Sequence, residues 1–366
     1  MNLLYIVPLL PRYDRGSGEN RLFEIMRLLC LKGCGVTVLQ AIPYTGIDEA
    51  RYEALLRDIG VRYVTQVGEF FKDVKSKDYD CCVISWYGLA LEYISLLRSK
   101  FPAAKIIVDS VDVHWLRYER GVISGELVMT PDELEYAKTQ EKLAYAEADE
   151  VWAVTQEDKN AILKELPDCE IRVVSNIHRK DFRNHSGVKN NNGIIFVGGF
   201  NHPPNESAAL WGYEICNKFR NNSRYSPLYY IVGDSPSERL RSLHDGSNSA
   251  VTGFVPDLYE YYKQSRVMIA PIKYGAGIKG KICHAICGGV PVITTDAGNE
   301  GLHLINGKEA LIANTTDEFV QCLDSIFSGK VDLLEMNKLA LCKVLMYTSE
   351  EIAWKTISTS LGFTRG

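Results

Sequence analysis

Short apolar runs alternate with amphipathic segments through the first half of the chain. The runs predict parallel strands covered on both faces, because such strands are apolar along their whole length. They lie at residues 3–10, 36–42, 61–67, 81–86, 105–109 and 150–155. The segments between them predict helices at residues 19–32, 48–59, 89–99 and 132–147. Regular alternation of this kind indicates a doubly wound α/β domain.

The alternation starts again after the polar segment RNHSGVKNNNG at residues 183–193, whose composition is typical of an exposed linker. The second half predicts strands at 194–200, 229–232, 250–255, 267–272, 290–295 and 311–313, and helices at 205–219, 257–264, 278–287 and 316–327. We therefore expect two Rossmann-like domains, residues 1–183 and 184–345. A last helix, predicted at 347–361, returns within residues 346–366 to the first domain. Because ligands of doubly wound sheets bind at the carboxyl ends of the strands, the cleft between the domains is the expected site.

Size and charge exclude several classes of protein. The 366 residues suit two domains rather than one. With 41 basic and 46 acidic residues and a net charge of -5, the chain has no broad positive field for a nucleic acid. The first apolar run is only about eight residues long and no basic residue precedes it, which favours a strand over a signal peptide. No stretch reaches the roughly 20 apolar residues of a membrane-spanning helix. We expect a cytoplasmic protein with at most peripheral membrane contact.

The ten cysteines form no CxxC pair and suit small buried residues in a reducing compartment. Cys283 and Cys287, with His284 between them on a predicted helix, leave a metal site as an alternative. No second cluster of ligands accompanies them, so the prediction is that the protein has no metal site.

The segment at residues 266–302, RVMIAPIKYGAGIKGKICHAICGGVPVITTDAGNEGL, carries the clearest chemistry. A strand, a loop with Gly275 and Gly277, a helix from about residue 278 and another strand follow one another. The free backbone N–H groups and the dipole at such a helix start favour an anion such as a diphosphate. Lys279 and Lys281 lie in the predicted first turn, where cations oppose the dipole unless an anion is present. This placement predicts a phosphate ligand, the alternative being two solvated lysines on a surface helix.

Several segments together resemble a known family. In the second half these are VTGFVPDL, APIKYGAGIKGKI, GGVPVITT, DAGNEGL and FVGGFNHPPNESA, and in the first half DSVDVHWLRYER and ADEVWAVTQED. In this order they resemble the retaining glycosyltransferases of glycosyltransferase family 4, the group 1 glycosyltransferases, which have the GT-B fold. The resemblance implies transfer of a hexose, with retention, from a GDP- or UDP-linked sugar to a glycan, glycolipid or glycoprotein acceptor, as in polysaccharide biosynthesis. Family frequency favours GDP-mannose and thus a mannosyltransferase.

The resemblance also implies which residues bind the donor. It points to the glycine loops and the segment after the strand at 290–295, and so to Gly199, Phe200, Gly275, Gly277, Asn299, Glu300 and Gly301. The family's two glutamates fall here on Ala276 and His284, and its common Arg/Lys phosphate pair is missing. His284 would then hydrogen-bond the ribose, the alternative being a helix histidine without a ligand. Glu300 has the alternative of a plain surface carboxylate. Phosphate neutralisation is left to Lys279 and Lys281, which we assign to catalysis.

The first domain offers a second group of cleft residues. Gly16 and Gly18 follow the first strand and allow a ligand to approach the backbone closely, although such a pair is also common in plain turns. His114 follows the strand at 105–109 and resembles the family's cleft histidine, which contacts the transferred sugar. Asp112 and Arg117 lie on the acceptor or phosphate side. In the alternative, the ring nitrogens of His114 hydrogen-bond to backbone groups, and Arg117 and Arg120 form ion pairs with Asp112 and Glu119.

The expected chemistry needs no metal and no cofactor beyond the donor itself. Charge that builds on the departing diphosphate is stabilised by lysines and helix N–H groups, and no pair of aspartates two residues apart follows a strand. Two other functions stay open: a nucleotide-sugar epimerase of the same fold, and a non-catalytic nucleotide-sugar binder, which the missing glutamates suggest.

Overall fold

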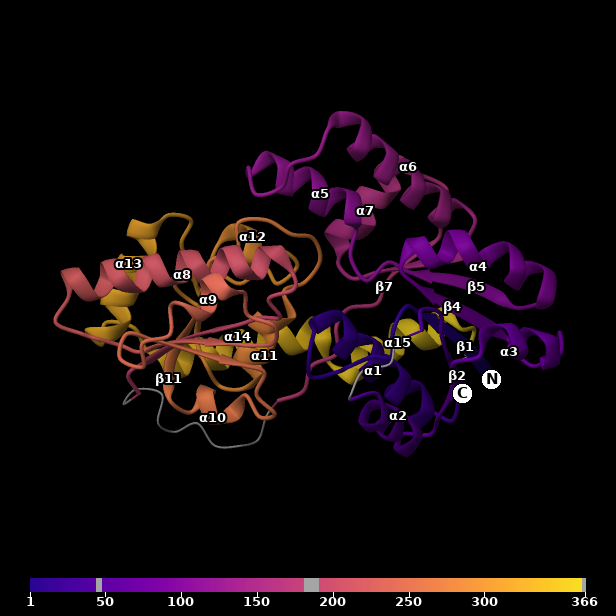
Figure 1. Ribbon diagram of the computed structural model, residues 1–366, viewed down its shortest axis with the longest axis horizontal. Coiled ribbons are helices and arrows are strands. Elements are labelled where there is room, and N and C mark those ends of the chain that lie inside the picture. Colours follow the sequence, from indigo (N-terminus) through magenta and orange to yellow (C-terminus); the bar gives the residue numbers. More distant parts are fainter. Residues whose placement is uncertain (44–47, 181–190, 364–366) are drawn as a thin grey trace.

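The computed structural model describes residues 1–43, 48–180 and 191–363. They form two α/β domains that lie side by side (Figure 1). The first has a seven-stranded sheet in the order β3-β2-β1-β4-β5-β6-β7, and the second a six-stranded sheet in the order β10-β9-β8-β11-β12-β13. All strand pairs are parallel. The predicted fold class, two facing Rossmann-like domains, is confirmed.

The first domain contains the strands β1 (Asn2–Val7), β2 (Gly35–Gln40), β3 (Val61–Val64), β4 (Cys81–Ser85), β5 (Lys105–Asp109), β6 (Glu150–Ala153) and β7 (Ile171–Val173). Its helices are α1 (Ser17–Leu31), α2 (Glu49–Asp58), α3 (Val67–Asp73), α4 (Tyr87–Lys100), α5 (His114–Ile123), α6 (Pro131–Ala146) and α7 (Gln156–Glu165). The second domain contains β8 (Gly193–Val197), β9 (Tyr229–Val232), β10 (Ser249–Gly253), β11 (Ser265–Ala270), β12 (Val292–Thr294) and β13 (Leu311–Ile312). Its helices are α8 (Pro203–Asn222), α9 (Glu238–Arg241), α10 (Tyr259–Tyr262), α11 (Gly280–Cys287), α12 (Asp296–Asn299), α13 (Thr316–Phe327) and α14 (Leu333–Thr348), and the last helix is α15 (Glu350–Ser360).

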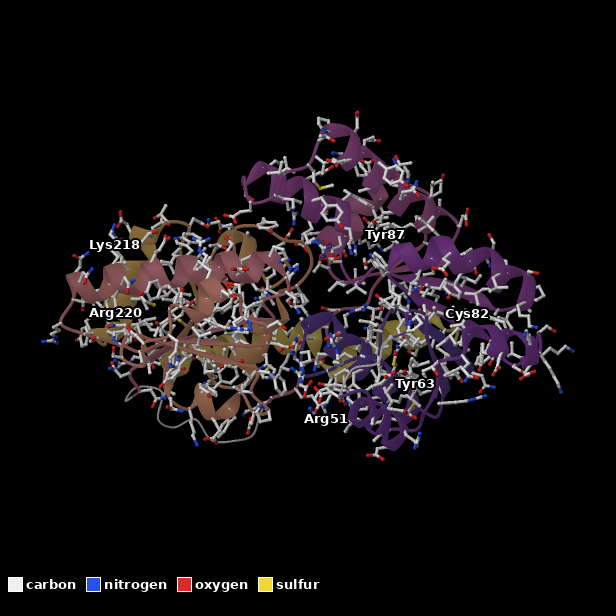
Figure 2. The ribbon with its side chains drawn as sticks, in the orientation of Figure 1. Arg51, Tyr63, Cys82, Tyr87, Lys218 and Arg220 are labelled. Atoms are coloured by element: carbon white, nitrogen blue, oxygen red, sulfur yellow. The ribbon has the colours of Figure 1, made fainter. Side chains whose placement is uncertain are left out.

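The inner strands of the first sheet are buried on both faces, as their apolar sequences predict, whereas the edge strands β3 and β7 are partly exposed. In β1, Leu3 and Tyr5 pack with α1 and α15 on one face, whereas Leu4 and Ile6 pack with α4 on the other. Successive side chains of a strand point to opposite faces, so one apolar strand serves two cores. Cys82 of β4 lies in the core on the α4 side and is fully buried (Figure 2).

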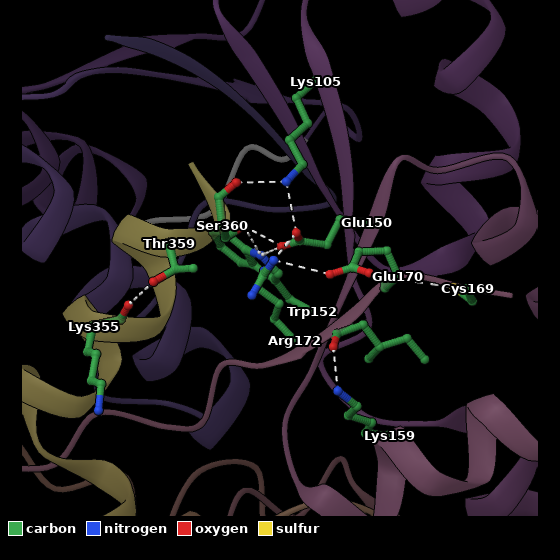
Figure 3. Close-up of polar contacts among 11 residues, drawn as sticks. Lys105, Glu150, Trp152, Lys159, Cys169, Glu170, Arg172, Lys355, Thr359 and Ser360 are labelled. Atoms are coloured by element: carbon green, nitrogen blue, oxygen red, sulfur yellow. Dashed lines mark hydrogen bonds and ion pairs between the residues drawn. The ribbon is translucent and has the colours of Figure 1, made fainter. Parts of the chain in front are cut away.

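The last helix, α15, returns to the first domain. Its Ala353 and Ile357 pack in the core with β1 and α1, and Ser360 at its end joins a polar cluster on the sheet (Figure 3). Lys105 Nζ donates to the Ser360 carbonyl at 2.7 Å and to Glu150 Oε2 at 2.8 Å. Trp152 Nε1 donates to Ser360 Oγ at 2.9 Å. These contacts fix the end of the chain on the first sheet.

The sequence misplaced some elements. The predicted helix at 347–361 is α15, which starts at Glu350 because α14 ends at Thr348 and Ser349 caps α15. The helices α3, α5, α7, α9 and α12 and the three-residue strand β7 were not predicted; they are short, and a periodic pattern is weakest over few residues. The 16-residue helix α14 was not predicted either. The predicted linker and both domain boundaries at 183 and 184 lie outside the described residues, apart from 191–193. Within the described residues, no helix combines the length and the apolar character that crossing a membrane requires.

Candidate active site

The loop between β11 and α11 is built on glycines. Gly275 and Gly277 have φ of 152° and 65°, a region that side chains rarely adopt. The helix begins at Gly280, so Lys279 is its N-cap and not, as predicted, a residue of its first turn. Lys279 Nζ folds back over the loop and donates to the Gly277 carbonyl at 2.7 Å. The lysine therefore closes the loop on itself.

Lys281 lies in the first turn of α11, as predicted. Its Nζ donates to Asn205 Oδ1 and lies 4.6 Å from the ring centre of Phe196. Asn205 Nδ2 donates in turn to the Gly199 carbonyl at 2.7 Å. Burial, together with the nearby charge of Lys279, lowers the pKa of Lys281 to about 7. None of the described contacts of the Lys281 ammonium group is with a carboxylate.

Glu300 joins the glycine loop to the first domain. Arg120 Nη1 and Nη2 each donate to one Glu300 oxygen at 2.7 Å, and Nη1 also donates to the Gly275 carbonyl at 2.7 Å. Lys279 Nζ lies 3.8 Å from Glu300 Oε2. Burial lowers the pKa of Lys279, although Glu300 and Asp158 act in the opposite direction. Glu300 is therefore shared between two cations, and Arg120 pairs with it rather than with Glu119.

The edge of the first sheet is acidic where His114 starts α5. The buried Glu141 accepts from the backbone N–H groups of His114 and Trp115, at 3.1 and 3.0 Å, and from the Tyr145 hydroxyl at 2.5 Å. This carboxylate from α6 caps α5, since anions stabilise helix N-termini. His114 Nδ1 lies 3.2 Å from Asp112 Oδ1, and neither atom has a hydrogen-bond partner among the described residues.

Arg117 donates to Asp112 at 2.5 Å, which is the pairing that the alternative interpretation expected. Its guanidinium group is thus held beside the acidic edge. His114 is surrounded by rings, with centroids at 5.2 Å for Tyr87 and 6.2 Å for Trp86 and Tyr118. The side chain of His114 therefore lies between an acidic group and an aromatic group.

The two predicted glycines after β1 lie at the start of α1. Gly16 is the N-cap of this helix and has an extended backbone. A Cβ on Gly18 would lie 3.0 Å from Val111 Cγ1. A Cβ on Gly280 would lie 2.0 Å from Ser17 Oγ, so the first turns of α1 and α11 touch. Both glycine-flanked helix starts thus meet at the domain boundary, where helix N–H groups favour an anion.

The other predicted donor residues have different surroundings. His284 is exposed, and its Nδ1 lies 2.9 Å from the Tyr262 hydroxyl. Phe200 is buried in the core of the second domain. Asn299 closes its own loop, with Nδ2 donating to the Leu304 carbonyl and Oδ1 accepting from the Leu304 N–H, both at 2.9 Å. Gly301 has φ of 74° and no room for a side chain against Thr155. His284, Phe200, Asn299 and Gly301 therefore lie at different places around the glycine loop.

Asp158 is a cleft residue that the sequence did not reveal. It belongs to the capping box of α7 with Thr155 and is 1% exposed. A Cβ on Gly277 would lie 3.7 Å from its Oδ2, which places it against the glycine loop of the other domain. Burial raises its pKa to about 6, and Asp112 adds to the effect. The sequence TQED predicts a helix cap, but only the fold brings this cap to the cleft.

A pocket of about 520 Å³ opens between the domains beside the Arg120–Glu300 ion pair. Gly275, Asn299 and Glu300 of the second domain and Arg120 of the first are among its lining residues. In the described part of the chain, no group of three or more His, Cys, Asp or Glu side chains is placed to hold a metal ion.

A second contact between the domains is made by Arg15 of the first domain. Arg15 Nη1 lies 3.1 Å from Asp234 Oδ2, and its guanidinium carbon lies 3.5 Å from the ring centre of Phe254. Arg15 is also close to the backbone of Gly199, where a Cβ would lie 3.3 Å from the Arg15 carbonyl oxygen. The carboxyl edges of both sheets are thus in contact at two places.

Known proteins resemble this chain in sequence over part of its length and in fold over its whole length. Residues 191–328 match the family model described as "Glycosyl transferases group 1". A comparison with curated proteins finds no matching sequence. Among solved structures, sucrose-phosphate synthase from Thermosynechococcus elongatus is 14% identical with a TM-score of 0.71, and the match covers 99% of this chain and 97% of that chain.

Two further structures are similar over their whole length. HepE of Anabaena, in complex with UDP and glucose, is 14% identical with a TM-score of 0.71, and the match covers 100% of both chains. TarM is 10% identical with a TM-score of 0.75, and the match covers 99% of both chains. A variant of S. aureus TarM was solved in complex with Fondaparinux, alpha-GlcNAc-glycerol and UDP. The chain therefore has the GT-B fold, and its second domain resembles the group 1 glycosyltransferases.

Proposed function

We propose that the protein is a glycosyltransferase that moves a hexose from a nucleoside diphosphate sugar to a glycan, glycolipid or glycoprotein acceptor. The observation that carries the proposal is the pair Lys279 and Lys281 at the start of α11. Burial lowers the pKa of both groups, which means that each charge is held at a cost. The positive end of the helix dipole adds to that cost. A diphosphate bound at this helix start would stabilise the charges of both lysines and the positive end of the helix dipole.

The two sides of the cleft suit the two partners of the reaction. When the bond between the anomeric carbon and the diphosphate breaks, negative charge builds on phosphate and positive charge on the sugar. Lys281 and the amides of α11 suit the phosphate. His114 and Asp112 on the facing edge suit the sugar and the acceptor hydroxyl. The Arg120–Glu300 ion pair holds the domains together over this site, and such closure excludes water.

The finer assignments rest on the resemblance of the whole set of motifs. We propose membership of glycosyltransferase family 4, retention of the anomeric configuration, and activity without a metal or a further cofactor. Family frequency favours GDP-mannose, whereas HepE and the TarM variant were solved in complex with UDP. Both nucleotides therefore belong among the donors to be tested.

The test is an assay of UDP- and GDP-sugars with the purified protein in EDTA, with and without a pool of glycan and glycolipid acceptors. We expect release of one nucleoside diphosphate that accelerates with acceptor, together with a product in which NMR shows a retained anomeric configuration. Without acceptor, the sugar released should be unchanged. An altered sugar without acceptor would instead identify an epimerase, and binding without any turnover would identify a binder.

A further inference from the structure

A second pocket, of about 490 Å³, lies wholly in the first domain. It is formed by α4, α5, α6 and the segment between α5 and α6, and Figure 2 labels one of its residues, Tyr87, below α5 and α6. Its walls include three tyrosine rings, those of Tyr87, Tyr118 and Tyr136. Tyr136 is 68% exposed, so its ring is open to a ligand.

This pocket lies next to His114 of the candidate active site. The ring centres of Tyr87 and Tyr118 lie 5.2 and 6.2 Å from that of His114. The same two tyrosines line the pocket. A ligand in the pocket would therefore be separated from His114 by one layer of aromatic rings.

The chemistry of the lining distinguishes between ligands. Glu133 and Gln140 stand among the tyrosines and supply carboxylate and amide groups. The Thr130 N–H donates to Glu133 Oε2 at 2.7 Å, and this hydrogen bond lowers the pKa of Glu133, so the carboxylate is ionised at neutral pH. Asp132 lies in the same turn of α6. Negative charge at the rim disfavours phosphate, uronate and anionic lipid.

Flat rings that carry hydroxyl groups, set beside a carboxylate and an amide, suit a neutral sugar. The C–H face of a sugar ring packs on an aromatic ring, and its hydroxyl groups donate to carboxylate and amide oxygens. We propose that the pocket between α4, α5 and α6 binds a neutral sugar residue of the acceptor, next to the one that is glycosylated. This inference rests on the proposed function, because only a transferase needs an acceptor beside His114.

The test measures binding without turnover. The full chain is applied to an immobilised panel of neutral oligosaccharides of glucose, galactose, mannose and N-acetylhexosamines, beside counterparts that carry uronate or phosphate. We expect retention on neutral members. Tyr136→Ala should weaken it about fivefold to tenfold, because a stacking ring is lost, whereas Tyr136→Phe should keep it. Tyr347→Ala, at a 39% exposed tyrosine of α14, is the matched control and should bind as the parent does.

Three results would overturn the inference: no retention on any neutral oligosaccharide, preference for the anionic counterparts, or a Tyr136→Ala variant that binds as the parent does. Vesicles of phosphatidylcholine and phosphatidylglycerol form a separate arm, and binding to them that Tyr136→Ala abolishes would assign the pocket to lipid instead. The affinity of each preparation for UDP-glucose and GDP-mannose is measured alongside. If oligosaccharides bind through Tyr136 but neither nucleotide sugar binds, the proposed function fails and the pocket remains a carbohydrate site.

Discussion

The carboxyl edges of the two sheets turn in different ways. In the second domain, Gly275, Gly277 and Gly301 supply the positive φ angles of the glycine loop and of the segment after α12. In the first domain, positive φ falls on Trp86 after β4, at 81°, and on Val111 after β5, at 63°. Glycine leaves the backbone open to a ligand, whereas bulky residues in this region store strain of about 1–3 kcal/mol each. The glycine loop thus leaves its backbone open, whereas the turns after β4 and β5 hold a strained backbone. Outside the glycine loop, positive φ also falls on Ser235 and His303 of the second domain.

Both edges carry charges of both signs, because Arg120 of the first domain pairs with Glu300 of the second. The groups whose pKa burial shifts toward the neutral form include Lys279 and Lys281 on the second domain and Asp158 on the first. Burial shifts the pKa of Lys281 down to about 7 and that of Asp158 up to about 6, so the charged form of each group is disfavoured. Perturbed groups that cluster in a cleft are typical of functional sites. The comparison separates a phosphate side from a sugar side.

The largest expected effect concerns the phosphate side. Lys281→Ala should lower kcat/KM by about 100- to 1,000-fold, because it removes a charge aimed at the departing diphosphate. The free energy of unfolding should not fall, since a cation with a depressed pKa costs stability. Lys338→Ala, at a 72% exposed side chain of α14, is the control. Transfer kinetics and denaturant unfolding measure both, and a Lys281→Ala enzyme of full activity would refute the assignment.

The next effect tests the sugar side. His114→Ala should lower kcat about 100-fold, while the Kd for the nucleotide sugar changes little, because the described contacts of His114 lie in the first domain. Rapid-quench kinetics and calorimetry separate the two quantities. His244→Ala, at an exposed histidine of the second domain, should change neither. A loss of donor affinity equal to the loss of kcat would place His114 on the phosphate side instead.

A smaller effect concerns the joint between the edges. Arg120→Ala removes the bidentate ion pair with Glu300 and the contact with the Gly275 carbonyl, so the domains should open and the KM for the donor should rise several-fold. Small-angle scattering should show a larger radius of gyration. Arg98→Ala is the matched control, because Arg98 makes a bidentate pair with Asp149, also at 2.7 Å, within one domain. An equal response of the two variants would show that Arg120 has no special role in closure.

The smallest effect is on stability. Asp158 has a raised pKa in the folded protein, so its contribution is favourable below the unfolded value and is lost as pH rises through about 6. Asp158→Asn keeps an oxygen that can cap α7 and removes the buried charge. At pH 7 it should raise the free energy of unfolding by on the order of 1 kcal/mol, with no gain at pH 4. Urea unfolding at both pH values measures this, and a loss of stability at pH 7 would contradict the buried-charge explanation.

The sequence predicted the fold because each strand that is buried on both faces is a continuous apolar run, which can be recognised without knowing its neighbours. Leu3, Tyr5 and Val7 of β1 are buried, and so are Leu4 and Ile6 between them. The boundaries were less accurate, since strand ends at the cleft continue into apolar loop residues. The prediction for 81–86, for example, included Trp86, which lies after β4 and has a strained backbone.

The sequence predicted the glycine loop and the helix that follows it better than the contacts across the cleft. Lys281 and the glycine loop lie within one short segment, so local spacing was sufficient. The contacts of Arg120 with Glu300, and of Asp158 with the glycine loop, join positions that are far apart in the chain and in different domains. No local pattern marks such partners. The pairing of Arg117 with Asp112 was foreseen only as an alternative.

The central claim is that Lys279 and Lys281, both partly buried, form a diphosphate site, and the protons taken up on donor binding test it most directly. UDP-glucose and GDP-mannose suit this measurement because their phosphates stay fully ionised between about pH 7 and pH 9, so a proton taken up belongs to the protein. Calorimetry in buffers of different ionisation enthalpy should show uptake approaching one proton at about pH 8, with log affinity falling as pH rises. In Lys281→Ala both effects should vanish. Tight binding that is independent of pH and unchanged by Lys281→Ala would contradict the account.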